Sequence, residues 1–279
     1  MRAIALAIIG LMTWGTIFCH ASNIKGNGNI VTKEIMDISD FTEIKVGRGI
    51  GAVGLGSFFF WGQKFKSPVF NYNQQEGKSG LEIKIDENLL PLLNITSTNG
   101  ILVIEAKKGD QIQPTALEIN GHSRELTKLS TQGSIDFYLK SNLTTDNLEI
   151  NTSGGSDAYL KNQVRISGLC QFNLSGGSDL KATDLVCDQI KIHTSGGSDI
   201  SLTGQANSGL YRSSGGSDIN AYNFVVKHLE CNSSGGSDIE TTVTESLKAS
   251  ASGGSDIMYK GDPKVNKSTS GGSDINHVN

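Results

Sequence analysis

Apolar and polar residues alternate through much of the second half of this 279-residue chain. Positions five and three residues before a recurrent serine are mostly apolar, and the position between them is mostly polar. The first set is Leu148, Cys170, Ile190, Gly209, Leu229, Leu247 and Val265, and the second is Ile150, Phe172, Ile192, Tyr211, Cys231, Ala249 and Lys267. A period of two predicts strands with one buried face.

The recurrent serine opens the motif Ser-Gly-Gly-Ser-Asp. Seven copies begin at Ser153, Ser175, Ser195, Ser214, Ser234, Ser252 and Ser270, at spacings of 18 to 22 residues. Apolar residues resume directly after each aspartate, at Ala158, Leu180, Ile200, Ile219, Ile239, Ile257 and Ile275. Self-similarity at this period predicts a solenoid, in which stacking at ~4.8 Å aligns these residues in a column.

The motif itself has the composition of a corner. Adjacent glycines allow bends that a Cβ forbids, and Ser and Asp side chains can bond the backbone groups that a bend leaves unpaired. Degenerate copies, "GNGNI" at 26–30, "GRGI" at 47–50 and "GSIDFYL" from Gly133, predict further coils toward the N-terminus. Alternation at 81–85 and 101–106 predicts strands, Asn99-Gly100 a turn, and "DENLLPLL" at 86–93 a short helical or irregular turn.

We therefore expect an all-β fold, a right-handed parallel β-helix or β-solenoid with rungs of about 18–22 residues and SGGSD corners. Residues 1–21 form a signal peptide, 22–130 an N-terminal β-rich part with an aromatic insertion at 54–80, and 131–279 the SGGSD-repeat solenoid.

The signal peptide is predicted from Arg2, an uncharged run from 3 to 19 and a small-residue cleavage site ending at Ala21. The apolar run falls short of the ~20 residues of a membrane span, which disfavours an uncleaved anchor. Cys19 could serve as a lipid-attachment cysteine, although bulky Phe18 before it argues against this. The protein is expected to be exported, to the periplasm or cell surface, without a membrane span after cleavage.

A formal charge of −4 without basic tracts argues against nucleic-acid binding. Cys170, Cys187 and Cys231 occupy non-equivalent repeat positions and are expected to be small buried residues, with a Cys170–Cys187 disulfide as the main alternative. The sequence holds no Cys-x-x-Cys pair, which disfavours zinc.

Seven serines beside seven aspartates invite a hydrolase reading, but a motif copied seven times is better explained by periodic structure than by catalysis. No Gly-x-Ser-x-Gly elbow is present, and His193 stands where other repeats carry Asn151, Asn173 or Arg212. His193 is therefore expected to be an outward strand residue. We expect no enzyme activity, and a polysaccharide-acting solenoid enzyme is the more distant alternative.

Calcium binding is the stronger alternative to a purely structural role for the motif, because "GGSD" resembles part of the Gly-Gly-x-Gly-x-Asp repeat of secreted β-rolls. A column of like charges a strand spacing apart costs stability unless hydrogen bonds or cations compensate. We favour hydrogen bonds and expect no cofactor, with a calcium-stabilised β-roll as the alternative. Its ligands would be Asp157, Asp179, Asp199, Asp218, Asp238, Asp256 and Asp274.

An aromatic cluster interrupts the N-terminal part. Phe58, Phe59, Phe60 and Trp61 stand together, followed by Phe65, Phe70 and Tyr72. The cluster is expected to cap the open end of the solenoid or to form a local core. Otherwise it is an exposed patch that binds a partner, with Phe58, Phe59, Phe60 and Trp61 as the contact residues.

With "DISDFTEIKVGRGIGAV", "DENLLPLLNITSTNGILVIEAKKG" and the tandem "SGGSDI" corners, the chain resembles the head-GIN domain family, described as adhesins of the autotransporter type and common among Bacteroidetes-type bacteria. The resemblance implies an exported β-solenoid protein of the envelope that acts in adhesion, as a binding or structural module. Its expected partner is an envelope or host glycan or protein, and self-association through the solenoid ends is a further expectation.

Overall fold

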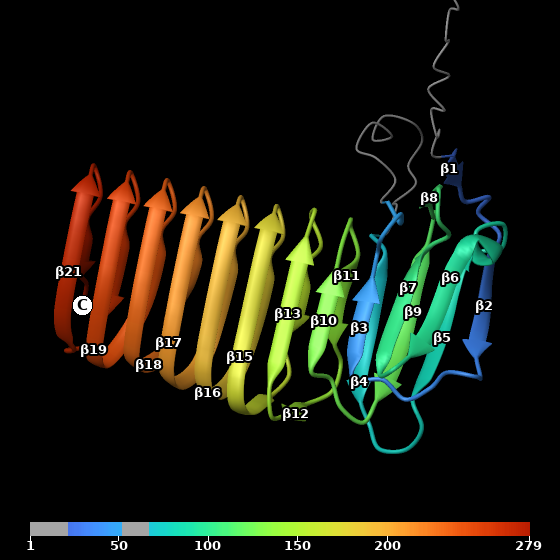
Figure 1. Ribbon diagram of the computed structural model, residues 1–279, viewed down its shortest axis with the longest axis horizontal. Helices are drawn as coiled ribbons and strands as arrows, with labels where there is room; N and C mark the ends of the chain where they lie inside the picture. Colours follow the sequence, from blue (N-terminus) through green and yellow to red (C-terminus); the bar gives the residue numbers. More distant parts are fainter. Residues whose placement is uncertain (1–21, 52–66) are drawn as a thin grey trace, which may run out of the picture.

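The computed structural model describes residues 22–51 and 67–279. These residues form stacked parallel coils, about eight turns in all, with the N-terminal strands at one end and β21 at the other (Figure 1). Strands facing the viewer rise to a corner, and the chain descends behind them while it advances toward β21, so the coils wind right-handed. The predicted all-β, right-handed β-solenoid is confirmed.

Each central coil consists largely of one long, bent strand. These strands are β15 (Val164–Gly176), β16 (Leu180–Gly196), β17 (Ile200–Gly215), β18 (Ile219–Gly235) and β19 (Ile239–Gly253). Each pairs in parallel with its successor, and the register shifts where the strand bends, as between Ala182 and Leu185 of β16. The bends lie on the side of each coil opposite the SGGSD corner. The variation in repeat length, from 18 to 22 residues, falls in the same segments.

Shorter strands build the coils on either side. Before the long strands come β10 (Lys128–Thr131), β11 (Asp136–Leu139), β12 (Leu143–Thr145), β13 (Leu148–Ser153) and β14 (Ala158–Leu160). The last coils contain β20 (Ile257–Lys260), β21 (Lys264–Gly271) and β22 (Ile275–His277).

The core is a set of apolar columns along the axis. Register places Leu180, Ile200, Ile219, Ile239, Ile257 and Ile275 in one such column, all of them buried. Burial of each large aliphatic side chain contributes about 1.5–3 kcal/mol relative to exposure, which is why one repeat cannot fold alone but a stack can. In a second column, which contains Cys231 and Ala249, Lys267 stands at the last coil in place of an apolar residue, and its Nζ donates to the Ile275 carbonyl at 3.0 Å. An inward charge of this kind discourages another chain from extending the sheet.

Every SGGSD motif forms a corner, as predicted. Its first glycine has φ between 73° and 88°, a conformation that favours glycine. Its second serine is buried, and from Ser178 onward that hydroxyl donates to the carbonyl of the first serine at 2.7–3.1 Å. From Gly197 onward the N–H of the second glycine donates to the first glycine of the preceding coil, at 2.7–2.8 Å.

Antiparallel strands close the N-terminal end. The outermost coil contains β7 (Ile101–Ala106), β8 (Asp110–Gln113) and β9 (Leu117–Ser123). Against it lie β6 (Leu93–Thr98), β5 (Gly80–Asp86) and β2 (Ile30–Ile35), while β1 (Ser22–Lys25) pairs with β8. The predicted strands at 81–85 and 101–106, the Asn99-Gly100 turn and the short helical turn, a 3-10 helix at Leu90–Leu92, are all present.

The coils do not follow chain order throughout. Strands β3 (Glu43–Val46) and β4 (Val69–Gln74) lie between the coil of β7 and β9 and the coil of β10 and β11. The "GRGI" segment at 47–50 is a corner of that inserted coil, with positive φ at Gly47 and Gly49.

The prediction that "GNGNI" at 26–30 is a solenoid corner is wrong. Ile30 opens β2, which runs antiparallel to β5, and the Gly28 N–H donates to Asp86 Oδ1 at 2.7 Å. Buried Asp86 also accepts the N–H and hydroxyl of Thr115, at 2.8 and 2.7 Å. The glycines here let the backbone approach a buried carboxylate. In the SGGSD motifs, by contrast, glycine allows the chain to turn a corner.

Candidate functional site

The motif aspartates form a continuous hydrogen-bonded ladder. Oδ1 of each aspartate from Asp136 to Asp256 accepts the backbone N–H of the aspartate one coil further on, at 2.9–3.3 Å, and the ladder ends at the N–H of Asp274. Asp136, in the degenerate corner after Gly133, supplies the first rung. Backbone N–H groups are therefore one compensation for the like charges, as expected, whereas the serine hydroxyls bond within the corner instead.

The start of the ladder is electrostatically the most costly part. Burial raises the pKa of Asp136 to about 6; the N–H of Asp157 lowers it and the carboxylate of Asp157 raises it further. Burial also raises the pKa of Asp179, with added repulsion from Asp157 and Asp199. Within residues 22–51 and 67–279 no three metal-ligating side chains are grouped so as to hold an ion. The expectation that the ladder needs no calcium stays a prediction.

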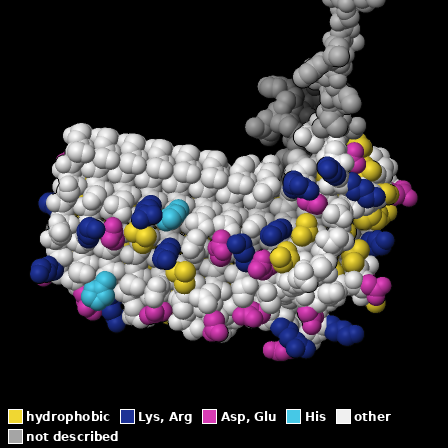
Figure 2. All heavy atoms as spheres, viewed as in Figure 1, with side chains coloured by type: hydrophobic (Ala, Val, Ile, Leu, Met, Phe, Trp, Pro, Cys, Tyr) yellow, Lys and Arg dark blue, Asp and Glu magenta, His cyan; other side chains and the backbone are white. Residues whose placement is uncertain are grey.

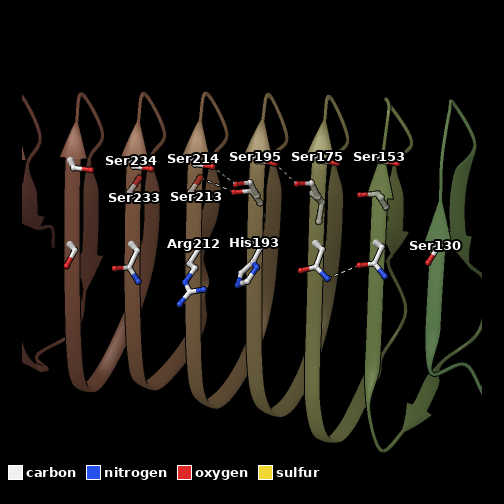
Figure 3. Close-up of a pocket in the computed structure, with 18 of the residues that line it drawn as sticks. Ser130, Ser153, Ser175, His193, Ser195, Arg212, Ser213, Ser214, Ser233 and Ser234 are labelled. Atoms are coloured by element: carbon white, nitrogen blue, oxygen red, sulfur yellow. Dashed lines mark hydrogen bonds between the residues drawn. The ribbon is translucent and has the colours of Figure 1, made fainter.

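A long groove runs across the strands that lead into the corners. Its volume is about 1040 Å³, and its lining extends from Lys45 on β3 to Ser270 on β21. One row of its lining is the first serine of each corner, and the other stands two residues earlier on the same strands (Figure 3). That second row comprises Ser130, Asn151, Asn173, His193, Arg212, Asn232, Ser250 and Ser268.

The groove is polar and almost free of apolar side chains. Its lining residues in the described part of the chain are mainly Ser, Thr and Asn, they include Lys45, Lys128, His193 and Arg212, and none of them is Asp or Glu. Within 22–51 and 67–279, Leu174 and Ala251 are the only apolar residues that line it, and both are buried. Figure 2 shows this face with uncharged surface over the upper ends of the strands and charged side chains in a band below. Such a surface can hydrogen-bond along its whole length but offers little to an acyl chain.

A family model described as "Putative auto-transporter adhesin, head GIN domain" matches residues 67–263, more than half of the chain. The chain belongs to this family. The resemblance drawn from the corners and the N-terminal motifs is confirmed.

Solved structures agree with this head GIN assignment. A "putative lipid binding protein" from Parabacteroides distasonis is 29% identical with a TM-score of 0.82, covering 92% of this chain and 100% of its own. "Putative adhesins" from Parabacteroides merdae and P. distasonis are 27% and 28% identical, with TM-scores of 0.80 and 0.79. They cover 93% and 92% of this chain, and all of their own. No curated protein matches.

The predicted partner-binding residues of this head GIN chain, Phe58, Phe59, Phe60 and Trp61, lie outside the described residues. Phe70 and Tyr72, at the end of the same cluster, are fully buried on β4 and stack near Phe137, with ring centroids 6.1 and 6.2 Å away. This part of the cluster is core, as one of the two expectations had it. Strands β2, β5 and β6 cover the N-terminal end.

The three described cysteines are buried and free, which agrees with their interpretation as small core residues and not with a Cys170–Cys187 disulfide. His193 faces outward, as predicted, but it also lines the groove. His228 contacts Ser246 Oγ at 2.9 Å and Glu245 at 3.3 Å. The His228 and Glu245 side chains are 55% and 54% exposed, so water competes for both and we assign the trio no catalytic role.

The sequence predicted the seven motif aspartates of the ladder, but not its first member, Asp136, and not the groove. The signal was present, because the positions two residues before each corner and at its first serine are outward in every repeat and rarely charged. In the described part of the chain, no helix has the length and apolar character to span a bilayer.

Proposed function

We propose that this protein is an exported, non-enzymatic adhesion module that binds an extended polysaccharide of the envelope or of a host along the groove. The observation that carries the proposal is the groove itself, which crosses nine neighbouring strands and is lined by hydroxyl and amide groups. Membership of a family described as adhesins supports the adhesive role, and the predicted signal peptide supports export.

A repeating ligand suits a repeating surface. Each coil presents nearly the same pair of outward polar positions, displaced by one strand spacing of ~4.8 Å. A polymer can therefore make one modest contact per coil, and many such contacts held on one chain add up to useful affinity without a deep pocket. Sugar hydroxyls can donate to and accept from Ser and Asn side chains alike.

The groove supports binding better than hydrolysis or lipid capture. Glycoside hydrolysis uses a pair of carboxyl groups about 5–10 Å apart, and no lining residue that the structure describes carries one. Acyl chains need apolar surface, which the lining residues barely expose. Lipid binding, named for one relative, therefore becomes an outcome of the test and not the proposal.

The test compares one substitution on two faces of strand β17. Ser214→Tyr places a ring in the groove, whereas Ser201→Tyr places the same ring at an exposed position near the start of the strand, after the preceding corner. Binding to a polysaccharide array and retention in gels cast with neutral or acidic polysaccharides should be lost in S214Y and kept in S201Y, with matching melting temperatures. Absence of retention by the unmodified protein, or equal loss in both variants, would refute the proposal.

A further inference from the structure

Three nitrogen-bearing side chains gather at the middle of the groove face. Lys191 and His193 stand two residues apart on β16, and Arg212 pairs in register with His193 from β17. Figure 3 shows His193 and Arg212 side by side, both pointing outward from the ribbon. The pKa of His193 is lowered by burial first, and then by the nearby charges of Arg212 and Lys191.

No carboxylate neutralises this group. The register neighbours of Lys191 are Gln171 and Leu210, and those of Arg212 are His193 and Asn232. The acidic residues of the surrounding row bond other lysines, since Glu230 pairs with Lys248 at 3.3 Å and Glu149 with Lys128 at 2.9 Å. Among the described residues neither Lys191 nor Arg212 forms an ion pair.

The chain carries a net charge of −4, but this part of its surface is positive. Two unpaired cations stand here beside a groove whose described lining has no carboxylate. We propose that Arg212, Lys191 and His193 form a subsite for an anionic group, a carboxylate or a sulfate ester, on an acidic polysaccharide lying in the groove. This inference rests on the proposed function and names its ligand class.

Each of the three side chains would make a different contact with the anionic group. Arg212 presents a planar donor fork that matches two oxygens of a carboxylate or sulfate, while Lys191 adds a point charge. His193 lines the groove between them, and its Nε2 is buried without a hydrogen-bond partner among the described residues. A ligand hydroxyl or oxyanion would reach this nitrogen once the ring turns toward the groove. Its facing neighbours are Lys191, Arg212 and neutral Asn173, with no acid among them.

The contacts also predict how the affinity for an anionic polymer changes with pH. Because burial and then the charges of Arg212 and Lys191 lower the pKa of His193 below its ordinary value, the neutral form prevails at pH 7 in the free protein. An anion at the subsite would favour its charged form, and binding should tighten as the pH falls from 7 toward 5. Added salt should weaken the same binding.

The experiment uses affinity electrophoresis and calorimetry with three probes: polygalacturonate for carboxylates, dextran sulfate for sulfates and dextran as the neutral polymer. Arg212→Gln and Lys191→Gln are compared with Lys181→Gln, which removes the same charge from an exposed position near the start of β16. Arg212→Gln should lower affinity for an acidic probe about tenfold or more, and Lys181→Gln should change it less than twofold. The probe that binds more tightly distinguishes carboxylate from sulfate.

Equal affinity for dextran and both acidic probes, or equal effects of R212Q and K181Q, would overturn the anion subsite. If dextran binding were still lost in S214Y, the proposed function would survive that result. Failure to bind any of the three polymers, or binding only to anionic phospholipid vesicles, would overturn both.

Discussion

Alanine at Gly215, the first glycine of one corner, should destabilise the protein measurably. Gly215 has φ +85°, and a left-handed backbone costs an L-residue about 1–2 kcal/mol. A Cβ there would also lie 3.1 Å from both the backbone N and O of Gly196 in the preceding coil, atoms that cannot rotate away. The expected loss in the free energy of unfolding is therefore at least about 1–2 kcal/mol.

The neighbouring glycine supplies a matched control. Gly216 lies outside the positive-φ region, and a Cβ on it would meet the Gly196 carbonyl oxygen at 3.7 Å, an ordinary contact. Gly215→Ala and Gly216→Ala have identical composition and differ by one position.

Thermal unfolding followed by circular dichroism should show Gly215→Ala melting about 2–8 °C lower than Gly216→Ala, at about 2–4 °C per kcal/mol. Equal melting temperatures, or a lower value for Gly216→Ala, would refute the corner geometry.

Two further predictions concern the aspartate ladder. Since the pKa of Asp136 is raised to about 6, against about 3.9 for an unfolded chain, its ionisation costs stability as the pH rises from about 4 to 6, and the full cost is present above that. Asp136→Asn should therefore raise the melting temperature at pH 7.5 and change it little at pH 4; the opposite order would contradict the sign. We also expect identical melting curves in EDTA and in millimolar calcium, because a backbone N–H already occupies one oxygen of every carboxylate that has a following coil. A calcium-dependent rise of several degrees would restore the β-roll alternative.

The repeat half of the fold could be predicted because its information is local. The alternation of apolar and polar residues predicted which positions form the buried columns, and the paired glycines predicted where the corners lie. Both depend on a few consecutive residues, and stacking then follows from the need to bury Ile200 and its equivalents. The aspartate ladder was foreseeable for the same reason, since equal spacing from the corner forces the carboxylates into one column.

The N-terminal half depends on contacts distant in sequence. Nothing near Gly47 shows that β3 enters the stack between β7 and β10, because its two partner strands lie more than 50 residues further along the chain. At Gly28 the partner is Asp86, 58 residues away, so a glycine pattern with the repeat period was mistaken for a corner. The groove was missed because the shape of an outward face depends on how the sheet curves, which alternation does not record.

The ladder makes each corner a template for the next. A coil contributes an acceptor carboxylate to its successor and receives one from its predecessor, so an added or deleted unit finds the same partners on both sides. Chain growth by tandem duplication would thus change the length of the groove face in steps of ~4.8 Å without redesigning the core. The number of coils would then set the length of the groove, while the chemistry of each coil stays fixed.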